Sequence, residues 1–562
     1  MTYTRILLAG SYRDGPGAET LPVGRRGRPQ FRYDRFVELV ARLRASRRVS
    51  TVLIEHRPDF EPGGLAAAES IRAALEGLAA AGKHLIYFCE DCDTVALYLA
   101  SACRTRVLHP AGELRVLGFS RRFFFPRKWF ERLGGRAVVI RRGEYKSAAD
   151  GLRTDSLDPA NRRQHYEYLD RAYRRFRETV AAALSKETSD LDVLASGHVL
   201  PAEQAVEHGW MTETATLCEL ERRLEDEKQK CRTPRLKGRF GRRGPRIAVL
   251  YLHGAICDGE SRRHPLLGNC VGDRTVSRDV RRLADDRKTA GVVLRVSSPG
   301  GAVLASESIR TELAYLRGKK PLVVSMGDVA GSGGYWIACE AERIFAEPDT
   351  LTGSVGVLTV AFDLTAGLKR HGIATDTVET APHAELASPF RRLSRDDYRI
   401  LDERVQRVYE DFLTRVAEAR GMSPDAVEQI AAGRLWSGEA AREVWLVDEL
   451  GGLPAAVSWL AERLGAKRVR QRHYPEVKPS LAQRLLAKNV PIGGAGAEAP
   501  TAGEAAAALR GAAAPGGVAA ALHGTLLAVV PELLLDASGF GGRRLGGHRF
   551  GGFPTVGGGP IA

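Results

Sequence analysis

The sequence predicts an α/β fold in two tandem copies, each with a parallel sheet and crossover helices. Short β-branched segments such as "TVLIEH" and "GVVLRV" alternate with helical patterns such as "AAAESIRAALEGLAAAG" and "ASESIRTELAYLRG". This alternation is typical of parallel strands that are joined by helices. A second observation is that motifs from the first half of the chain recur in the second half.

The repeat keeps a constant spacing along the chain. The segment "IEHRPDFEPGGLAAAESIRAAL" matches "LRVSSPGGAVLASESIRTEL" in its Pro-Gly-Gly and Glu-Ser-Ile-Arg motifs. A separation of 237 positions holds for three pairs, which are Pro62 and Pro299, Lys83 and Lys320, and Gly135 and Gly372. A constant separation over this length indicates duplicated domains.

Composition divides the chain into four expected regions. Residues 1–226 form the first repeat and residues 246–480 the second. The intervening segment 227–245 is basic and almost without apolar residues, and we interpret it as a linker. Residues 481–562 are rich in Ala, Gly and Pro, which predicts a flexible tail because such a segment buries too little apolar surface to fold alone.

The overall composition is that of a soluble globular protein, with 44% hydrophobic and 27% charged residues. The net charge is +15, but arginine is spread along the whole chain, so we expect no nucleic-acid partner. The apolar run at residues 6–9 is too short for a signal peptide and predicts a buried first strand. With no leader or anchor visible, we expect a cytoplasmic or peripherally membrane-associated protein. Residues 121–134, "RRFFFPRKWFERLG", form either an apolar, basic-rimmed surface or an ordinary amphipathic helix.

The cysteines do not predict a disulfide scaffold or a metal site. Eight cysteines in 562 residues are too sparse for disulfide cross-linking of the fold. Cys89 and Cys92 have the spacing of metal ligands, but no second pair completes a tetrahedral site. We therefore expect neither a metal ion nor an organic cofactor.

A candidate nucleophile lies in "VVSMGDVAGSGGYWIA", where a strand runs into a glycine-rich turn and then a helical pattern. Such a turn exposes the hydroxyl of Ser332, although an ordinary glycine-rich bend would explain the same residues. The similar turn "SSPGG" follows another strand, and parallel strands end at the same edge of a sheet. The backbone N–H groups of Gly301 and Gly333 are therefore candidate donors to an oxyanion.

The base that would activate Ser332 is left open by the residues alone. His371 and His383 follow the serine, but neither stands in a context that favours catalysis. Lys146 in "VVIRRGEYKSAADGL" follows a strand and meets small residues. A buried lysine can act as a neutral base, whereas a lysine taken without context is usually exposed.

Four motifs together resemble the signal peptide peptidase A (protease IV) family, peptidase family S49, in its long duplicated form. They are "GEYKSAAD", "SPGG", "GDVAGSGGYWIA" and "LTGSVGV", and the resemblance covers residues 1–465. It implies a crotonase/Clp-protease-like α/β fold and a Ser/Lys dyad. By resemblance, Ser332 is the nucleophile, Lys146 is the general base and Ser354 orients the lysine. The amides of Gly301 and Gly333 would bind the oxyanion.

The resemblance also implies a serine endopeptidase that degrades released signal peptides or other unfolded apolar peptides without a cofactor. Family members assemble into bowl-shaped homo-oligomers, and a tetramer is the implied state. Long members usually carry an N-terminal membrane anchor, and none is visible in this sequence.

The duplication gives each proposed catalytic residue a counterpart. The position that matches Lys146 in the second copy is His383, and the position that matches Ser332 in the first copy is Val95. This arrangement favours one active site per chain, shared between the copies. The alternatives are an inactive peptide-binding scaffold of the same fold, a crotonase-like acyl-CoA enzyme, and an α/β-hydrolase, against which the duplication argues.

Overall fold

The computed structural model describes residues 2–16, 30–227, 230–231, 244–264 and 268–475. The expected tail at 481–562 lies outside the described residues, as does most of the expected linker at 227–245. The boundaries of the four regions therefore stay predictions. Within the described residues, no helix is long and apolar enough to cross a bilayer. The location of the protein likewise stays a prediction.

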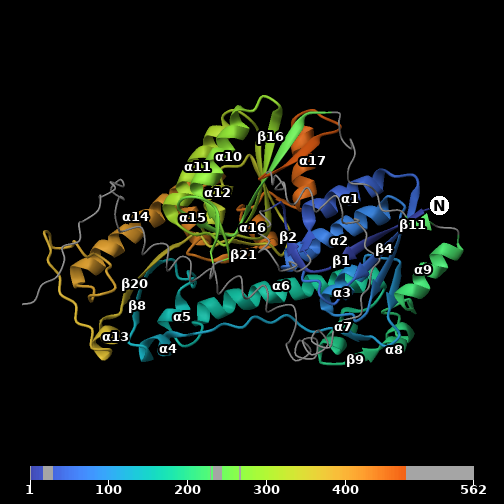
Figure 1. The fold of residues 1–562 in the computed structure, drawn as a ribbon, viewed down its shortest axis with the longest axis horizontal. Coiled ribbons are helices and arrows are strands. Elements are labelled where there is room, and N and C mark those ends of the chain that lie inside the picture. The colour runs from blue at the N-terminus through green and yellow to red at the C-terminus, as the bar shows by residue number, and fades with distance from the viewer. Residues whose placement is uncertain (1, 17–29, 228–229, 232–243, 265–267, 476–562) are drawn as a thin grey trace, which may run out of the picture.

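The first repeat is built on a six-stranded parallel sheet in the order β10-β6-β5-β4-β1-β11. Its strands are β1 (Thr2–Leu8), β4 (Val49–His56), β5 (His84–Cys89), β6 (Thr105–Leu108), β10 (Glu213–Thr214) and β11 (Lys230–Cys231). Strand β4 is buried along almost its whole length because helices lie on both faces of the sheet (Figure 1). The predicted first strand is present as β1, with Ile6 and Leu8 buried.

Helices and short strands complete the first repeat. The helices are α1 (Tyr33–Ala45), α2 (Leu65–Ala80), α3 (Thr94–Ala100), α4 (Arg127–Arg132), α5 (Asp150–Arg153), α6 (Pro159–Leu184), α7 (Thr188–Ala195), α8 (Ala202–Glu207) and α9 (Leu217–Asp226). The remaining strands are β2 (Ser11–Arg13), β3 (Gln30–Arg32), β7 (Glu113–Arg115), β8 (Arg136–Arg142) and β9 (Val199–Pro201). The longest of these helices, α6, runs beneath both halves of the molecule (Figure 1).

The second repeat has a corresponding sheet in the order β21-β19-β17-β16-β12-β23, with β18 also beside β17 and β22 beside β18. Its strands are β12 (Arg246–His253), β16 (Thr289–Ser298), β17 (Leu322–Gly331), β18 (Arg343–Ala346), β19 (Leu351–Gly353), β21 (Leu435–Ser437), β22 (Glu449–Leu450) and β23 (Arg470–Tyr474). Pairing is parallel except between β19 and β21. A small sheet contains β13 (Ala255–Cys257), β14 (Arg262–His264) and β15 (Gly268–Gly272).

The helices of the second repeat confirm the duplication. They are α10 (Asp273–Asp285), α11 (Val303–Arg317), α12 (Gly333–Ala338), α13 (Thr365–Arg370), α14 (Arg395–Arg420), α15 (Pro424–Ile430), α16 (Gly438–Glu443) and α17 (Leu453–Arg463). Helices α14 to α17 begin 236 positions after α6 to α9, in the same order. The predicted tandem α/β architecture is therefore present.

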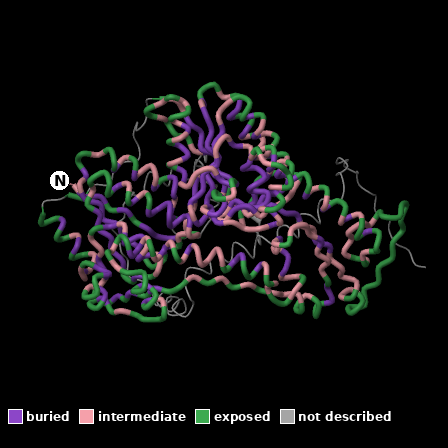
Figure 2. The backbone as a smooth tube through the Cα atoms, turned by 180° about the vertical axis from the view of Figure 1, so that it is seen from behind, coloured by how far each residue is buried: buried purple, intermediate pink, exposed green. Residues whose placement is uncertain are grey.

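The two repeats share a core instead of folding as separate bodies. One cluster of buried side chains joins Leu75 and Tyr87 of the first repeat to Val293, Phe345 and Leu460 of the second. Figure 2 shows the buried backbone running continuously through the middle of the molecule. The removal of this apolar surface from water stabilises the pair of repeats as one unit.

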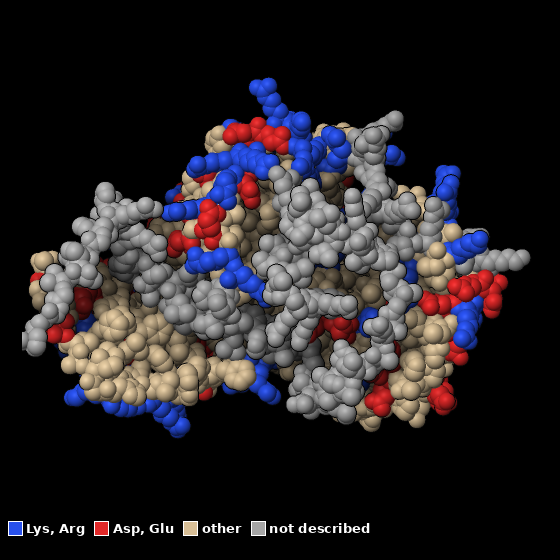
Figure 3. Space-filling model, in the orientation of Figure 1, with Lys and Arg blue, Asp and Glu red and all other residues tan. Residues whose placement is uncertain are grey.

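An arm from each repeat joins the halves a second time. Strand β20 (Val357–Asp363) of the second repeat pairs antiparallel with β8 of the first, and this ribbon lies at the left of the view with α4 and α13 (Figure 1). Trp129 on α4 is 64% exposed, which at this residue favours the apolar, basic-rimmed surface over the amphipathic helix with Trp packed inward. Figure 3 shows basic side chains along the lower edge of the arm, below a surface of uncharged residues.

Candidate active site

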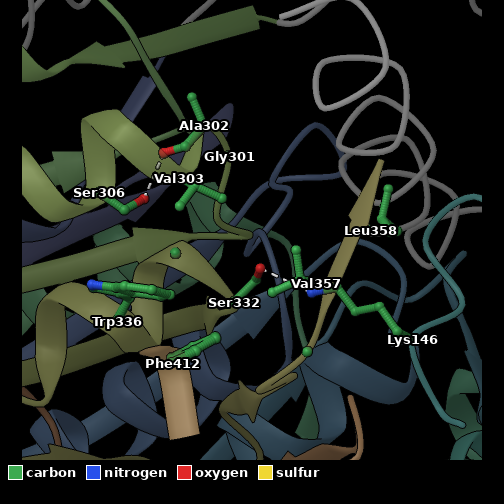
Figure 4. Close-up of a pocket in the computed structure, with 12 residues that line it drawn as sticks. Lys146, Gly301, Ala302, Val303, Ser306, Ser332, Trp336, Val357, Leu358 and Phe412 are labelled. Carbon is green, nitrogen blue, oxygen red and sulfur yellow. Dashed lines mark hydrogen bonds between the residues drawn. The ribbon is translucent and has the colours of Figure 1, made fainter. Parts of the chain in front are cut away.

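Ser332 lies in the turn between β17 and α12, where the sequence predicts a strand followed by a helix. Its backbone has φ 53° and ψ −123°, an uncommon conformation for a residue with a side chain. The Ser332 amide donates to the carbonyl of Gly353 (2.9 Å), which holds the turn in place. The surrounding structure thus maintains a strained turn that directs the hydroxyl toward a pocket (Figure 4).

Lys146 reaches this serine from the other repeat. Its side chain is 3% exposed, and Nζ lies 2.9 Å from Ser332 Oγ in a hydrogen bond (Figure 4). The lysine stands in the loop after β8, where Tyr145 donates its amide to the carbonyl of Ala432 (2.8 Å). Residues 186 positions apart therefore meet in one site.

Ser354 contacts the same ammonium or amine group. Lys146 Nζ donates to Ser354 Oγ and to the Ser354 carbonyl, each at 3.1 Å. Ser354 has φ 52°, and its amide donates to the carbonyl of Arg434 (2.7 Å). The lysine is therefore held on one side by Ser354 while its remaining side faces Ser332.

Two glycine turns bring the candidate oxyanion donors together. The Gly301 amide nitrogen lies 3.3 Å from the point where a Cβ on Gly333 would be. Gly301 has φ +153°, and a Cβ there would lie 2.0 Å from the Ile256 carbonyl oxygen. Only glycine fits this position because β13 passes so close to it.

An apolar pocket adjoins the serine and the lysine. Sequence reasoning did not select the side chains that line it, which are Ala302, Val303, Ser306, Trp336, Val357, Leu358 and Phe412. They come from α11, α12, β20 and α14, so distant segments contribute to one surface (Figure 4). Trp336 follows the serine motif, but no local pattern marks Phe412 or Val357 as pocket residues.

A buried carboxylate supports the lysine loop. Asp150 Oδ1 accepts hydrogen bonds from Arg153 Nη2 (3.0 Å) and Arg141 Nη1 (3.3 Å), and Oδ2 accepts one from Asn161 Nδ2 (3.1 Å). Arg141 also donates to the carbonyl of Lys146 (2.9 Å). Burial raises the pKa of the Asp150 carboxyl group. The sequence shows Asp150 near Lys146 but not the network that connects them.

His383, another candidate base, and the cysteine pair considered as metal ligands make contacts of their own. His383 hydrogen-bonds Asp397 Oδ1 through Nδ1 (2.8 Å). Cys89 and Cys92 are buried free thiols, and burial raises the pKa of Cys92. Among the described residues, no group of three or more His, Cys, Asp or Glu side chains could hold a metal ion.

Comparison with known proteins agrees with the duplication seen in the fold. The model of "Peptidase family S49" matches twice, at residues 78–230 and 314–467. Protease 4 of Salmonella typhi is 33% identical over 74% of this chain and 69% of its own length. The chloroplastic serine protease SPPA of Arabidopsis thaliana is 30% identical over 69% of this chain and 60% of its own length. The solved structure of a ClpP1 mutant from Listeria monocytogenes matches 37% of this chain and 94% of its own, with 16% identity and a TM-score of 0.25.

The family match and the two similar proteases define the class of protein as a serine peptidase, a hydrolase that acts on peptide bonds. The family model covers more than half of the chain. The chain belongs to peptidase family S49, in a form that carries the family domain twice. The resemblance found in the sequence motifs is thereby confirmed.

Proposed function

We propose that this serine peptidase works through a Ser/Lys dyad assembled from both repeats. Ser332 is the nucleophile and Lys146 the general base. The observation that carries this proposal is the 2.9 Å contact between Lys146 Nζ and Ser332 Oγ in a buried site. The mechanism uses Lys146 as the neutral amine, which can accept the serine proton.

The reaction is acyl transfer in two stages. Neutral Lys146 accepts the proton of Ser332, and Oγ attacks the peptide carbonyl carbon. The tetrahedral intermediate collapses as the lysine ammonium protonates the departing amine, which leaves an acyl-enzyme. A water molecule, deprotonated by the same lysine, then attacks the ester, and the lysine ammonium returns the proton to Ser332 Oγ as the acid leaves.

The amides of Gly301 and Gly333 stabilise the negative oxygen of both tetrahedral intermediates. Gly333 is the first residue of α12, where the amide has no carbonyl partner within its own helix. The two turns lie close enough for both amides to face one oxygen. Ser354 keeps the Lys146 side chain directed at the nucleophile by accepting its other hydrogen bonds.

Unfolded apolar peptides, including released signal peptides, are the substrates that we propose. The pocket beside Ser332 is lined mainly by apolar side chains, among them Val303, Trp336 and Phe412. An apolar side chain of an extended peptide would gain free energy there by leaving water. A folded protein would not present its backbone to a serine that is 8% exposed.

We further propose a homo-oligomer in which the arms of neighbouring copies pair. Within one chain, β20 pairs with β8 so that Val357 stands opposite Arg142. By the duplication, residues 120–126 correspond to β20 and residues 373–379 to β8. Neither segment forms a strand in the described structure, and residues 373–379 are exposed throughout.

Segments 120–126 and 373–379 of two copies would suit each other in register and charge. The register of β8 and β20 would place Ser120 opposite Glu379 of the next copy. Segment 120–126 carries the exposed Arg122, and segment 373–379 carries Asp376 and Glu379. Head-to-tail contacts of this kind close into rings when the rotation permits. A tetramer is the closed state that the family resemblance implies.

Substitution of the dyad tests the proposal directly. Ser332→Ala should abolish cleavage of unfolded casein, because the nucleophile is lost. Lys146→Ala should lower the cleavage rate by about 10²–10⁴, the usual contribution of a general base. The exposed Lys369→Ala serves as a control and should cleave like the parent. Undiminished cleavage by a folded Lys146→Ala variant would refute the dyad.

A further inference from the structure

The first repeat retains a glycine turn that faces no serine of its own. Pro62, Gly63 and Gly64 precede Pro299, Gly300 and Gly301 by 237 positions, at the start of α2. The position that matches the nucleophile in this repeat is Val95. The turn is therefore the counterpart of the proposed oxyanion loop without its catalytic partner.

A carboxylate from the second repeat occupies this turn. Asp328 Oδ1 accepts a hydrogen bond from the amide of Ala67 (2.8 Å), in the first turn of α2. A Cβ on Gly64 would lie 2.6 Å from the same oxygen, and one on Gly63 would lie 3.2 Å from Oδ2. The glycines thus leave room for the carboxylate, and the positive end of the α2 helix dipole favours its charge.

Asp328 lies at the point where β17 stops pairing with one strand and begins to pair with another. Before it, residues 323–325 of β17 pair with β18, and after it residues 329–331 pair with β19. Along β16, Val296 pairs with Met326 and Ser298 pairs with Ala330, so residues 327–329 bulge opposite a single residue. Such a bulge redirects a strand, and Ser332 follows four residues after Asp328.

The bulge is anchored from both repeats. Within the second repeat, Thr350 Oγ1 donates to the carbonyl of Gly327 (2.8 Å) and Arg295 Nη1 donates to that of Met326 (2.6 Å). Asp328 supplies the contact to the first repeat. Two further contacts join α2 to the same edge: the amide of Asp349 donates to Glu69 Oε2 (2.9 Å), and Ser70 Oγ donates to Glu347 Oε1 (2.5 Å).

We propose that Asp328 is a positioning residue through which the glycine turn of the first repeat fixes the strand that carries Ser332. The inference rests on the proposed role of Ser332 as nucleophile. A displacement of about 1 Å at a reacting group can cost a factor of about 10² in rate. The vestigial turn of the first repeat therefore sets the distance between Ser332 and Lys146.

Burying the carboxyl group of Asp328 costs folding free energy, and this cost agrees with a role in positioning. Burial raises the pKa of its carboxyl group to about 7, and the charge of Asp14 adds to the effect. A buried carboxylate destabilises the fold at neutral pH. Such a residue is expected where the geometry that activity requires is kept at the expense of stability.

The rate of covalent labelling of Ser332 by a fluorophosphonate tests the inference on the full chain. Asp328→Ala should label at least about tenfold more slowly than the parent while kcat for an apolar peptide falls and KM stays within about twofold. Asp328→Asn retains an acceptor oxygen and should recover most of the rate. Asp91→Ala changes the matching position in the first repeat and should label like the parent.

Two comparisons separate this inference from the proposed function. If Ser332→Ala labels like the parent, the nucleophile assignment fails. If Ser332→Ala abolishes labelling while folded Asp328→Ala keeps the parental rate, the positioning role is refuted. If Asp328→Ala does not fold, Gly64→Ala tests the inference instead. The Cβ added at residue 64 would displace the Asp328 carboxylate without removing it. A parental labelling rate in Gly64→Ala would contradict the inference.

Discussion

Backbone conformation at Ser332 decides where its hydroxyl lies. The glycine-rich sequence around it predicts a sharp turn, yet the left-handed φ of 53° falls on the serine itself. Glycine would adopt that φ at lower cost, so the side chain is retained against a local preference. Sequence motifs could suggest that Ser332 and Lys146 share a site, but not the strained conformation or the support that Asp150 gives to the lysine loop.

Removal of the Ser354 hydroxyl should weaken catalysis without preventing it. Ser354→Ala removes one of the acceptors that direct Lys146 Nζ, and we expect kcat to fall about tenfold with little change in KM. Ser147→Ala, a hydroxyl removed from the lysine loop itself, is the matched control. Steady-state kinetics on an apolar peptide would measure both variants. Equal kcat values for the two would show that Ser354 does not orient the lysine.

The buried carboxyl of Asp328 predicts a pH dependence of stability. Its folded-state pKa of about 7 lies above the ordinary value of 3.8. The group therefore stabilises the fold fully below about pH 4, and this contribution is lost as the pH rises through 7. The neighbouring charges of Asp14, Arg295 and Glu347 are unchanged in Asp328→Asn.

Thermal unfolding of Asp328→Asn and the parent, measured from pH 5 to pH 8, isolates this effect. The melting temperature of the variant relative to the parent should rise with pH, by about 2–4 °C for each kcal/mol of relative stability gained. A difference that stays constant over this range would show that Asp328 does not titrate there.

At the scale of secondary structure, regular elements follow from local pattern and the contacts between them do not. The strand and helix around Ser332 agree with the alternation of apolar and glycine-rich segments. The pairing of β8 with β20 joins segments more than 200 positions apart, and no local pattern specifies it. The pocket depends on this pairing because β20 contributes Val357 and Leu358. The docking of α2 against Asp328 is equally long-range.

For the whole molecule, duplication explains both the shared active site and the proposed assembly. Each chain has one complete pair of proposed catalytic residues because the repeats diverged at Val95 and His383. The proposed interface between two copies would bring Val95 of one copy near His383 of the other. We therefore expect no second active site at that interface. The sequence could predict the duplication from a constant spacing, whereas the common core required the structure.

A proline placed in segment 373–379 tests whether copies assemble through this segment and segment 120–126. Thr375→Pro removes a backbone donor and should reduce the mass in solution toward the 61.1 kDa of one chain. Thr375→Val keeps the donor and should preserve the larger mass. Light scattering after size exclusion would measure both variants. A parent that is already a monomer, or a proline variant of unchanged mass, would refute this interface.

The central claim is that Ser332 is activated by a lysine from the other repeat. Its most direct test is to label the full chain with a fluorophosphonate and locate the adduct by mass spectrometry. We predict a single adduct on Ser332, formed about 10²–10⁴ times more slowly in a folded Lys146→Ala variant. An adduct on another residue, or an unchanged labelling rate without Lys146, would contradict the claim.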